Sequence, residues 1–158
     1  MSTIDATMAS TATANLEFAT FFLGDLWLGV DIQAIQEINA DLDVTSVPHT
    51  PESVAGVVNL RGDVVTIVDL RVVFGLEPCQ ITNRTRNVIV TAGGEKIGLL
   101  VDRVGDVVVA KAHEIDSNPA NIEEIAARFL AGVYQGDDEL LAIVDTDEVL
   151  RVDESVDE

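Results

Sequence analysis

Short apolar runs separated by turns rich in glycine and aspartate recur along the chain, and this pattern is typical of an all-β protein. The clearest example is residues 56–75, GVVNLRGDVVTIVDLRVVFG, in which the runs VV and VVTIV flank the turn sequence NLRGD. Glycine next to aspartate between two such runs predicts a hairpin with Arg61 at its tip. Because both arms are too apolar for a strand with one wet face, each is expected to be covered on both faces, by the core on one and by other protein or a partner on the other.

Aspartate and glycine also predict where two short helices begin and end. Asp69 follows the second arm of this hairpin at the position of a helix N-cap, and Gly75 stands where a C′ glycine ends a helix. The same order of elements closes the chain. Two apolar runs within residues 130–144 predict another hairpin, and Asp145 is expected to cap a last helix that ends near Leu150.

The remaining strands are predicted by the same criteria at residues 17–23, 26–30, 44–47, 87–91, 96–101 and 104–110. Residues 31–40 stay open, because their apolar spacing suits a helix capped by Asp31 and equally suits a strand entered by one helical turn. Residues 76–86 have no apolar period and are expected to form a linker, and residues 122–128 predict a helix.

The two halves of the chain present the same elements in the same order, which predicts an internal repeat of roughly 70 residues. Two ungapped frames align the halves, one through Gly24 and Gly93, Gly29 and Gly98, and Ile35 and Val104, the other through Gly56 and Gly132, Ile67 and Ile143, and Asp69 and Asp145. The predicted fold is mainly β, with two curled five-stranded lobes packed together and short helices. The lobes are expected at about 16–80 and 81–150, between a disordered tail at 1–15 and an acidic tail at 151–158.

Charge narrows the classes of partner. The 158 residues carry a formal net charge of −19, with Lys+Arg 9 against Asp+Glu 28. Nucleic-acid binding draws its affinity from lysine and arginine, and an anionic lipid surface attracts the same residues, so neither partner is expected. No run approaches the roughly 20 apolar residues of a membrane span, and the start of the chain lacks the features of a signal peptide. A cytoplasmic protein without membrane insertion is therefore predicted.

The sequence gives no support for catalytic or cofactor chemistry. It contains no GxSxG, HExxH, CxxC or phosphate-loop pattern, and the single Cys79 can form neither an intrachain disulfide nor a metal site. A protein without enzymatic activity, cofactor or metal is therefore predicted. A small-ligand-binding β-barrel is a less favoured alternative, and a barrel for single-stranded nucleic acid would need aromatic platforms and a basic groove.

Four motifs, VVNLRGDVVTIVDLRVVFGL, LGVDIQAIQEI, IGLLVDRVGDVV and LLAIVDTDEVL, together resemble the CheW family of chemotaxis coupling proteins. The resemblance runs from about Glu17 to Leu150, and NLRG followed by VDLR is highly specific to this family. It implies two SH3-like β-barrel subdomains and a non-catalytic scaffold that couples the cytoplasmic tip of chemoreceptors to the histidine kinase CheA in membrane-attached arrays. The alternative is a CheW-like adaptor of another chemosensory kinase system, such as one controlling twitching motility. A fused receiver domain is not expected, because the chain ends with the second lobe.

The resemblance also implies which residues bind partners. In the family the receptor hairpin lies in an apolar groove between the subdomains, and the first subdomain also meets the regulatory domain of the kinase. The matching positions, expected to bind receptor or kinase, are Ile35, Glu37, Gly56, Asn59, Arg61, Gly98, Val104 and Val107. Such a groove would accept the apolar face of a receptor helix.

Several of these residues also have a purely structural interpretation. Arg61 aligns with an acidic turn in the second half of the chain, so its role belongs to the first half alone. It either meets a carboxylate or a helix end of the partner, or forms an ion pair with Asp63 or Glu37 within the chain. The isoleucine and valine positions suit core packing equally well, and the glycines suit turns or close packing.

Overall fold

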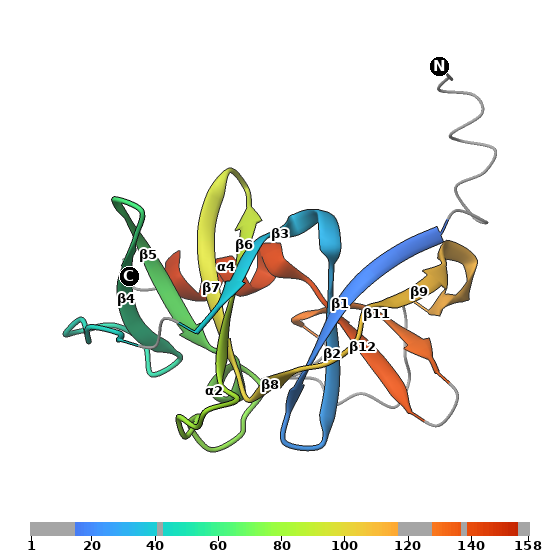
Figure 1. Ribbon diagram of the computed structural model, residues 1–158, viewed down its shortest axis with the longest axis horizontal. Coiled ribbons are helices and arrows are strands. Elements are labelled where there is room, and N and C mark those ends of the chain that lie inside the picture. The colour runs from blue at the N-terminus through green and yellow to red at the C-terminus, as the bar shows by residue number, and fades with distance from the viewer. Residues whose placement is uncertain (1–14, 41–42, 117–127, 137–138, 155–158) are drawn as a thin grey trace.

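The computed structural model describes residues 15–40, 43–116, 128–136 and 139–154, which form two β-sheets with a shared core. In Figure 1 the five-stranded sheet is drawn mainly in green and yellow, and the seven-stranded sheet mainly in blue and orange. The prediction of a mainly β fold with short helices is confirmed. Residues 122–127 of the predicted helix, and residues 1–14 and 155–158 of the predicted tails, lie outside the described residues.

The five-stranded sheet comes from the middle of the chain. Its strands are β3 (Ile35–Asn39), β4 (Val54–Leu60), β5 (Asp63–Asp69), β6 (Arg86–Ala92) and β7 (Glu95–Val101). Their order is β3-β6-β7-β5-β4, with β5 and β7 parallel and the other neighbours antiparallel. The hairpin predicted within residues 56–75 is therefore formed by β4 and β5, and β4 lies at one edge of the sheet.

The seven-stranded sheet draws on both ends of the chain. Its strands are β1 (Asn15–Leu23), β2 (Leu26–Asp31), β8 (Arg103–Val104), β9 (Val108–Lys111), β10 (Ile115–Asp116), β11 (Leu130–Gln135) and β12 (Leu140–Val144). The path is β10-β11-β12-β2-β1-β8, and β9 also pairs with β1. Five strands were expected in each lobe, and this sheet has more because its outer pairings are made by three short strands, β8, β9 and β10.

The two halves of the chain exchange hairpins between the sheets. Strand β2 runs parallel to β12, with Leu28 opposite Ala142, and β7 runs parallel to β5, with Ile97 opposite Thr66. Each parallel pair thus joins the first hairpin of one half to the second hairpin of the other half. A boundary near residue 80 consequently does not separate the sheets, because β5 and β7 lie on either side of it and are paired.

The strand register confirms the internal repeat. Ile35 pairs with β6, and its predicted equivalent Val104 pairs with β1, so that the two pairings occupy matching places in the two sheets. The second hairpins also match in detail. Each carries a β-bulge at the same position, before Gly56 on β4 and before Gly132 on β11.

The predicted aspartate caps of two helices are confirmed. Asp69 Oδ1 accepts the N–H of Arg71 at 3.0 Å and caps α2 (Leu70–Val73). Asp145 Oδ1 accepts the N–H of Asp147 at 3.1 Å and caps α4 (Thr146–Glu154), which extends past the expected end at Leu150. No helix in the described part of the chain is long and apolar enough to cross a membrane.

Residues 31–40 adopt the second of their two predicted structures. A 3-10 turn, η2 (Ile32–Ala34), is capped by Asp31 and leads directly into β3. A second 3-10 turn, η3 (Ala112–Glu114), leads into β10 in the same way. The three-residue spacing of the isoleucines therefore does not produce an α-helix here.

Two predicted strands are shorter than expected. The run at 104–110 is broken between β8 and β9, where the N–H of Gly105 donates to the carbonyl oxygen of Thr20 at 2.8 Å and the Thr20 hydroxyl donates to the carbonyl oxygen of Asp106 at 2.5 Å. The run at 44–47 contributes a single bridge, between Thr45 and Val57. Both interruptions bring an irregular segment against the side of a strand.

The main core joins the two sheets. Leu23 and Leu28 of the seven-stranded sheet belong to the same buried cluster as Val90 and Leu99 of the five-stranded sheet, and Val149 of α4 completes it. Burial of aliphatic side chains stabilises a fold by about 25 cal/mol per Å² of apolar surface. Since both sheets contribute to this cluster, it holds them together and positions the hairpin ends described below.

Candidate docking surface

The tip of the β4–β5 hairpin is a two-residue turn formed by Arg61 and Gly62. Their φ angles are +52° and +90°, and a type I′ turn requires positive φ at both positions. The N–H of Gly62 donates to Asn59 Oδ1 at 3.1 Å. Asn59, a candidate binding residue from the sequence, therefore fixes the turn that carries Arg61. The left-handed conformation costs an arginine about 1 kcal/mol, and strained positions of this kind concentrate at functional sites.

An ion pair connects the hairpin tip to the opposite edge of the sheet. The Arg61 guanidinium contacts the carboxylate of Glu37 on β3, and their side chains are 76% and 20% exposed. Because β3 and β4 are the two edge strands, this contact shows that the sheet curls until its edges approach each other at this end. Of the two intrachain partners considered for Arg61, Glu37 is therefore the one observed.

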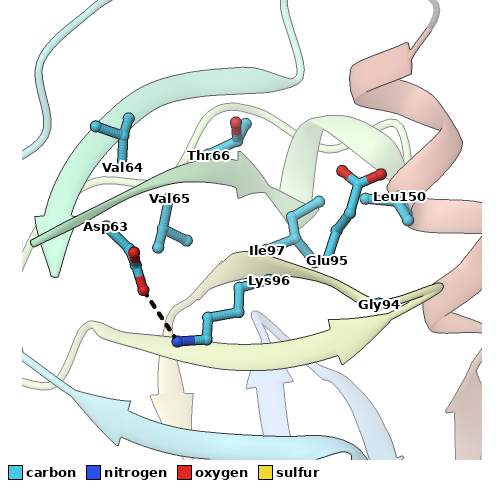
Figure 2. Close-up of a pocket in the computed structure, with 9 residues that line it drawn as sticks. All are labelled: Asp63, Val64, Val65, Thr66, Gly94, Glu95, Lys96, Ile97 and Leu150. Atoms are coloured by element: carbon cyan, nitrogen blue, oxygen red, sulfur yellow. Dashed lines mark hydrogen bonds and ion pairs between the residues drawn. The ribbon is translucent and has the colours of Figure 1, made fainter. Parts of the chain in front are cut away.

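A pocket of about 410 Å³ opens beside the tip, between β5 and β7, with Leu150 of α4 at its far side (Figure 2). Asp63 at the start of β5 pairs with Lys96 of β7 across it, with 3.3 Å between Oδ2 and Nζ. Val64 is 70% exposed, so at this end the outer face of β5 is not covered by the described part of the chain, and of the two expected covers a partner is the one left. We refer to Glu37, Arg61, Asp63, Val64 and Lys96 as the tip surface.

The pKa of Glu37 is lowered by its neighbours. The main cause is the hydrogen bond from Asn39 Nδ2 to Glu37 Oε2, at 2.8 Å, followed by the contact with Arg61 and the charge of Lys96. Its carboxylate is therefore charged at neutral pH, and the stability it contributes is lost only as the pH falls through this lowered pKa.

This pKa shift gives a prediction that NMR can check. A titration that follows the Glu37 side-chain carboxyl carbon should give a midpoint below the ordinary glutamate value. In the Arg61→Gln variant the midpoint should rise only part of the way, because the hydrogen bond from Asn39 remains. An unchanged midpoint in this variant would show that the ion pair does not persist in solution.

Two of the candidate glycines are explained by close packing. A Cβ on Gly56 would lie 2.2 Å from the carbonyl oxygen of Thr45, and a Cβ on Gly98 would lie 2.4 Å from Cδ1 of Ile67. Gly56 is buried at the bulge of β4, and Gly98 is buried in the middle of β7. Both positions shape the sheet behind the tip surface, and neither presents a side chain to a partner.

The three apolar candidates are divided between the sheets. Ile35 is partly buried and packs against the main core from β3. Val104 on β8 is 37% exposed, and Val107 in the following loop is 52% exposed. The two valines thus form an exposed apolar edge on the seven-stranded sheet, whereas Ile35 belongs to the five-stranded sheet.

Val64 and Lys96 were not among the binding residues predicted from the sequence. Val64 belongs to an apolar run, and such a run normally indicates burial. Lys96 had a weak signal, because it is a single cation on a strand of a very acidic chain. Its pairing with Asp63 depends on the parallel alignment of β5 and β7, which sequence spacing does not reveal.

The lone cysteine lies in surroundings that disfavour its thiolate form. Burial and, after it, the carboxylate of Asp102, whose Oδ1 lies 3.5 Å from Sγ, together raise the pKa of the Cys79 thiol to about 12. A thiol with this pKa is protonated at neutral pH and does not attack electrophiles. Among the described residues, no group of three or more His, Cys, Asp or Glu side chains is arranged to hold a metal ion.

Alkylation kinetics test the state of this thiol. At pH 8 the folded protein should react with iodoacetamide on the order of a thousandfold more slowly than the chain unfolded in urea, because its thiolate fraction is smaller by that factor. The chain has one cysteine, so the intact mass reports a single site. Equal rates in the two states would mean that Cys79 is accessible and ionised in the folded protein.

Comparison with known proteins identifies the fold that carries this surface. A family model described as the CheW-like domain matches residues 17–154. The chain belongs to the CheW family. The resemblance seen in the sequence is thereby confirmed, and with it the predictions of a CheW-like fold and of a non-catalytic chemotaxis scaffold.

Individual members of the CheW family match over most of their length. The chain is 34% identical over 142 residues to the chemotaxis protein CheW of Klebsiella aerogenes, covering 90% of this chain and 86% of that protein. It is 29% identical over 149 residues to the protein FrzA of Myxococcus xanthus, covering 93% and 92%. The crystal structure of the scaffolding protein TtCheW from Thermoanaerobacter tengcongensis superposes with a TM-score of 0.77 at 30% identity, covering 84% of this chain and 90% of that one.

Proposed function

We propose that this chain couples chemoreceptors to the histidine kinase CheA by binding the cytoplasmic tip of the receptor and the regulatory domain of the kinase. The match of residues 17–154 to the CheW-like domain carries the proposal. A coupling protein of this kind works in the cytoplasm and is recruited to receptor arrays attached to the membrane. We infer that location for this chain.

The tip surface has the composition of a docking site. Val64 offers exposed apolar area, and the ion pairs of Arg61 with Glu37 and of Lys96 with Asp63 flank it with four charges. Exposed ion pairs contribute only about 0–1 kcal/mol to the stability of a fold. Their charges therefore remain available to a partner, where they set orientation and specificity.

The exposed apolar edge suits the receptor. A receptor tip is a helical hairpin, and helices dock through apolar positions spaced along one face. Val104 and Val107 are apolar, exposed and three residues apart in the chain. Ile35 is half-buried, so we infer that it contributes through the part of its side chain that faces outward.

A pull-down with both partners tests the proposal. The purified chain is mixed with a CheA regulatory domain and with a receptor cytoplasmic fragment, separately and together, at low and at high salt. Each partner should be retained, and each should increase retention of the other. If the folded protein retains neither partner at any salt concentration, the coupling function is rejected and the candidate residues lose their assignment.

A second candidate function keeps the scaffold role and changes the system. A protein that does not carry the name CheW, FrzA of Myxococcus xanthus, also matches over 149 residues. The fold alone therefore does not assign the kinase, and an adaptor of another chemosensory kinase system, such as one that controls twitching motility, is the second candidate. The same pull-down separates the two functions. Retention of the kinase of the other system, without retention of CheA, would establish the second candidate.

A further inference from the structure

A basic cleft is formed in part by the linker that follows α2, although the chain as a whole is acidic. The chain has Asp+Glu 28, yet residues 78–94 contain no acidic residue and include Arg84. This segment forms part of a cleft of about 460 Å³ whose charged lining is completed by Arg71, Glu77, Asp102 and Arg103. We refer to the residues lining this cleft, Thr82 among them, as the basic cleft.

At the floor of the basic cleft, Arg71 and Asp102 form an ion pair in which their opposite charges cancel. Arg71 Nη1 donates to Asp102 Oδ2 at 2.6 Å, and Arg71 Nε donates to the carbonyl oxygen of Glu77 at 2.7 Å. The same carboxylate accepts the N–H of Gly24 at 2.7 Å. Both side chains are mostly buried, so the negative charge of Asp102 is satisfied and does not neutralise the other arginines.

Arg84 is presented at the tip of a rigid turn. The N–H of Thr82 donates to Thr85 Oγ1 at 2.8 Å, and the N–H of Arg84 donates to Thr82 Oγ1 at 3.1 Å. Arg86 Nη1 then donates to the carbonyl oxygens of Asn83 and Thr85, at 2.9 and 2.8 Å. The side chains of Thr82, Thr85 and Arg86 thus all form hydrogen bonds with the backbone of this turn. The Arg84 side chain itself is exposed.

Arg103 is held in place by an aromatic ring. Its guanidinium lies over the ring of Phe22, with 3.7 Å between Cζ and the ring centroid. Stacking occupies the face of the guanidinium and leaves the N–H donors along its edge free. In the part of the chain that the structure describes, neither Arg84 nor Arg103 forms an ion pair with a carboxylate.

We propose that the basic cleft binds an acidic segment of a protein partner, with carboxylates of that segment received by Arg84 and Arg103. An arginine fork matches a carboxylate in a bidentate geometry, and the fork of Arg103, already stacked on Phe22, loses less freedom when it binds. Nucleic acid fits poorly, because its affinity comes from many lysine and arginine contacts to successive phosphates, whereas this cleft offers Arg84 and Arg103 beside the acidic Glu77. The inference goes beyond the proposed function, since neither arginine belongs to the tip surface or to the apolar edge.

Fluorescence anisotropy with a labelled hexaglutamate peptide tests this proposal. The full-length protein should bind the peptide with an affinity that falls as salt increases, and a hexaglutamine peptide should not bind. The Arg84→Gln/Arg103→Gln variant should bind hexaglutamate more than about tenfold more weakly, because charge-assisted hydrogen bonds are among the strong ones. Inorganic phosphate and vesicles containing anionic lipid serve as the competing probes.

A matched control uses the same change in charge at another place. Arg128→Gln/Arg151→Gln removes two arginines that both pair with Glu148, at 3.6 and 3.1 Å, and this variant should bind the peptide like the unaltered protein. Equal binding by the two double variants would overturn the proposal. So would the absence of peptide binding at low salt, or tighter binding of phosphate or vesicles than of the peptide.

Two further comparisons show whether a loss of peptide binding reflects the basic cleft itself, a loss of folding, or a failure of the proposed coupling function. The single variant Arg84→Gln changes a side chain on the surface of a turn that the threonines maintain, so it should weaken peptide binding without lowering the unfolding midpoint. The peptide assay contains neither receptor nor kinase. A negative pull-down with a positive peptide assay would therefore reject only the proposed coupling function, and the reverse result would reject only the basic cleft.

Discussion

Replacing Gly56 by alanine is expected to lower the free energy of unfolding by about 3 kcal/mol, since backbone strain adds to a steric clash. The φ angle of Gly56 is +148°, and a Cβ would lie 2.2 Å from the carbonyl oxygen of Thr45. That oxygen cannot move aside easily, because Thr45 and Val57 exchange two backbone hydrogen bonds, of 2.8 and 2.9 Å. Equilibrium unfolding in urea, monitored by circular dichroism, measures the change.

Gly62→Ala is the matched control for this prediction. Gly62 also has a positive φ, +90°, but a Cβ there would meet nothing within 4 Å. Its substitution should therefore cost only the backbone strain, about 1 kcal/mol. If the two variants unfold at the same urea concentration, the contact with Thr45 does not restrict Gly56. A large difference would mean that any loss of partner binding in the Gly56 variant reflects folding.

Features fixed by neighbouring residues could be predicted from the sequence. The turn at Arg61 and Gly62 and the N-caps at Asp69 and Asp145 depend on contacts between residues that are two or three positions apart. The internal repeat was also predictable, because glycine and isoleucine positions recur in both halves. The bulges before Gly56 and Gly132 preserve that alignment in the structure.

The exchange of hairpins between the sheets could not be predicted in the same way. The pattern that makes β2 and β7 strands is nearly the same, and either could pair with β5 or β12 as far as local sequence is concerned. The choice is made by the shared core, in which Leu28 and Leu99 meet residues distant in the chain. The repeat requires only that the two parallel pairs share one register, and they do, with Gly98 opposite Ile67 and Gly29 opposite Ile143.

Only part of the candidate site could be predicted from the sequence. Glu37 and Arg61 are 24 positions apart, and their contact depends on how far the sheet curls. The exposure of Val64 contradicts the usual meaning of an apolar run, and a docking surface of the kind we propose has the composition of a core. Exposed apolar residues such as Val64 can be identified only once the fold shows which face of the strand is not covered.

Arg61→Asp is expected to reduce receptor-coupled kinase activation more than about tenfold while leaving the fold intact, because reversing a charge at an interface replaces attraction by repulsion. The Arg61 side chain is 76% exposed, so the folded chain loses only a surface ion pair. The measurement is CheA autophosphorylation in the presence of receptor and of this chain, with the unfolding midpoint recorded for each variant. Arg151→Asp makes the same change in charge at a side chain that is 61% exposed, and it should leave activation unchanged.

A charge exchange distinguishes recognition by a partner from a purely structural role of this ion pair. In the Glu37→Arg/Arg61→Glu variant the two edges of the sheet can still be joined by opposite charges, but the charge presented at the hairpin tip is reversed. If the pair only closes the sheet, this variant should activate the kinase as the unaltered protein does. If a partner carboxylate meets Arg61, the variant should fold normally and remain as inactive as Arg61→Asp. We expect the second result, because a pair with such an exposed arginine contributes little to stability, whereas a strained left-handed residue at a hairpin tip is well placed for contact.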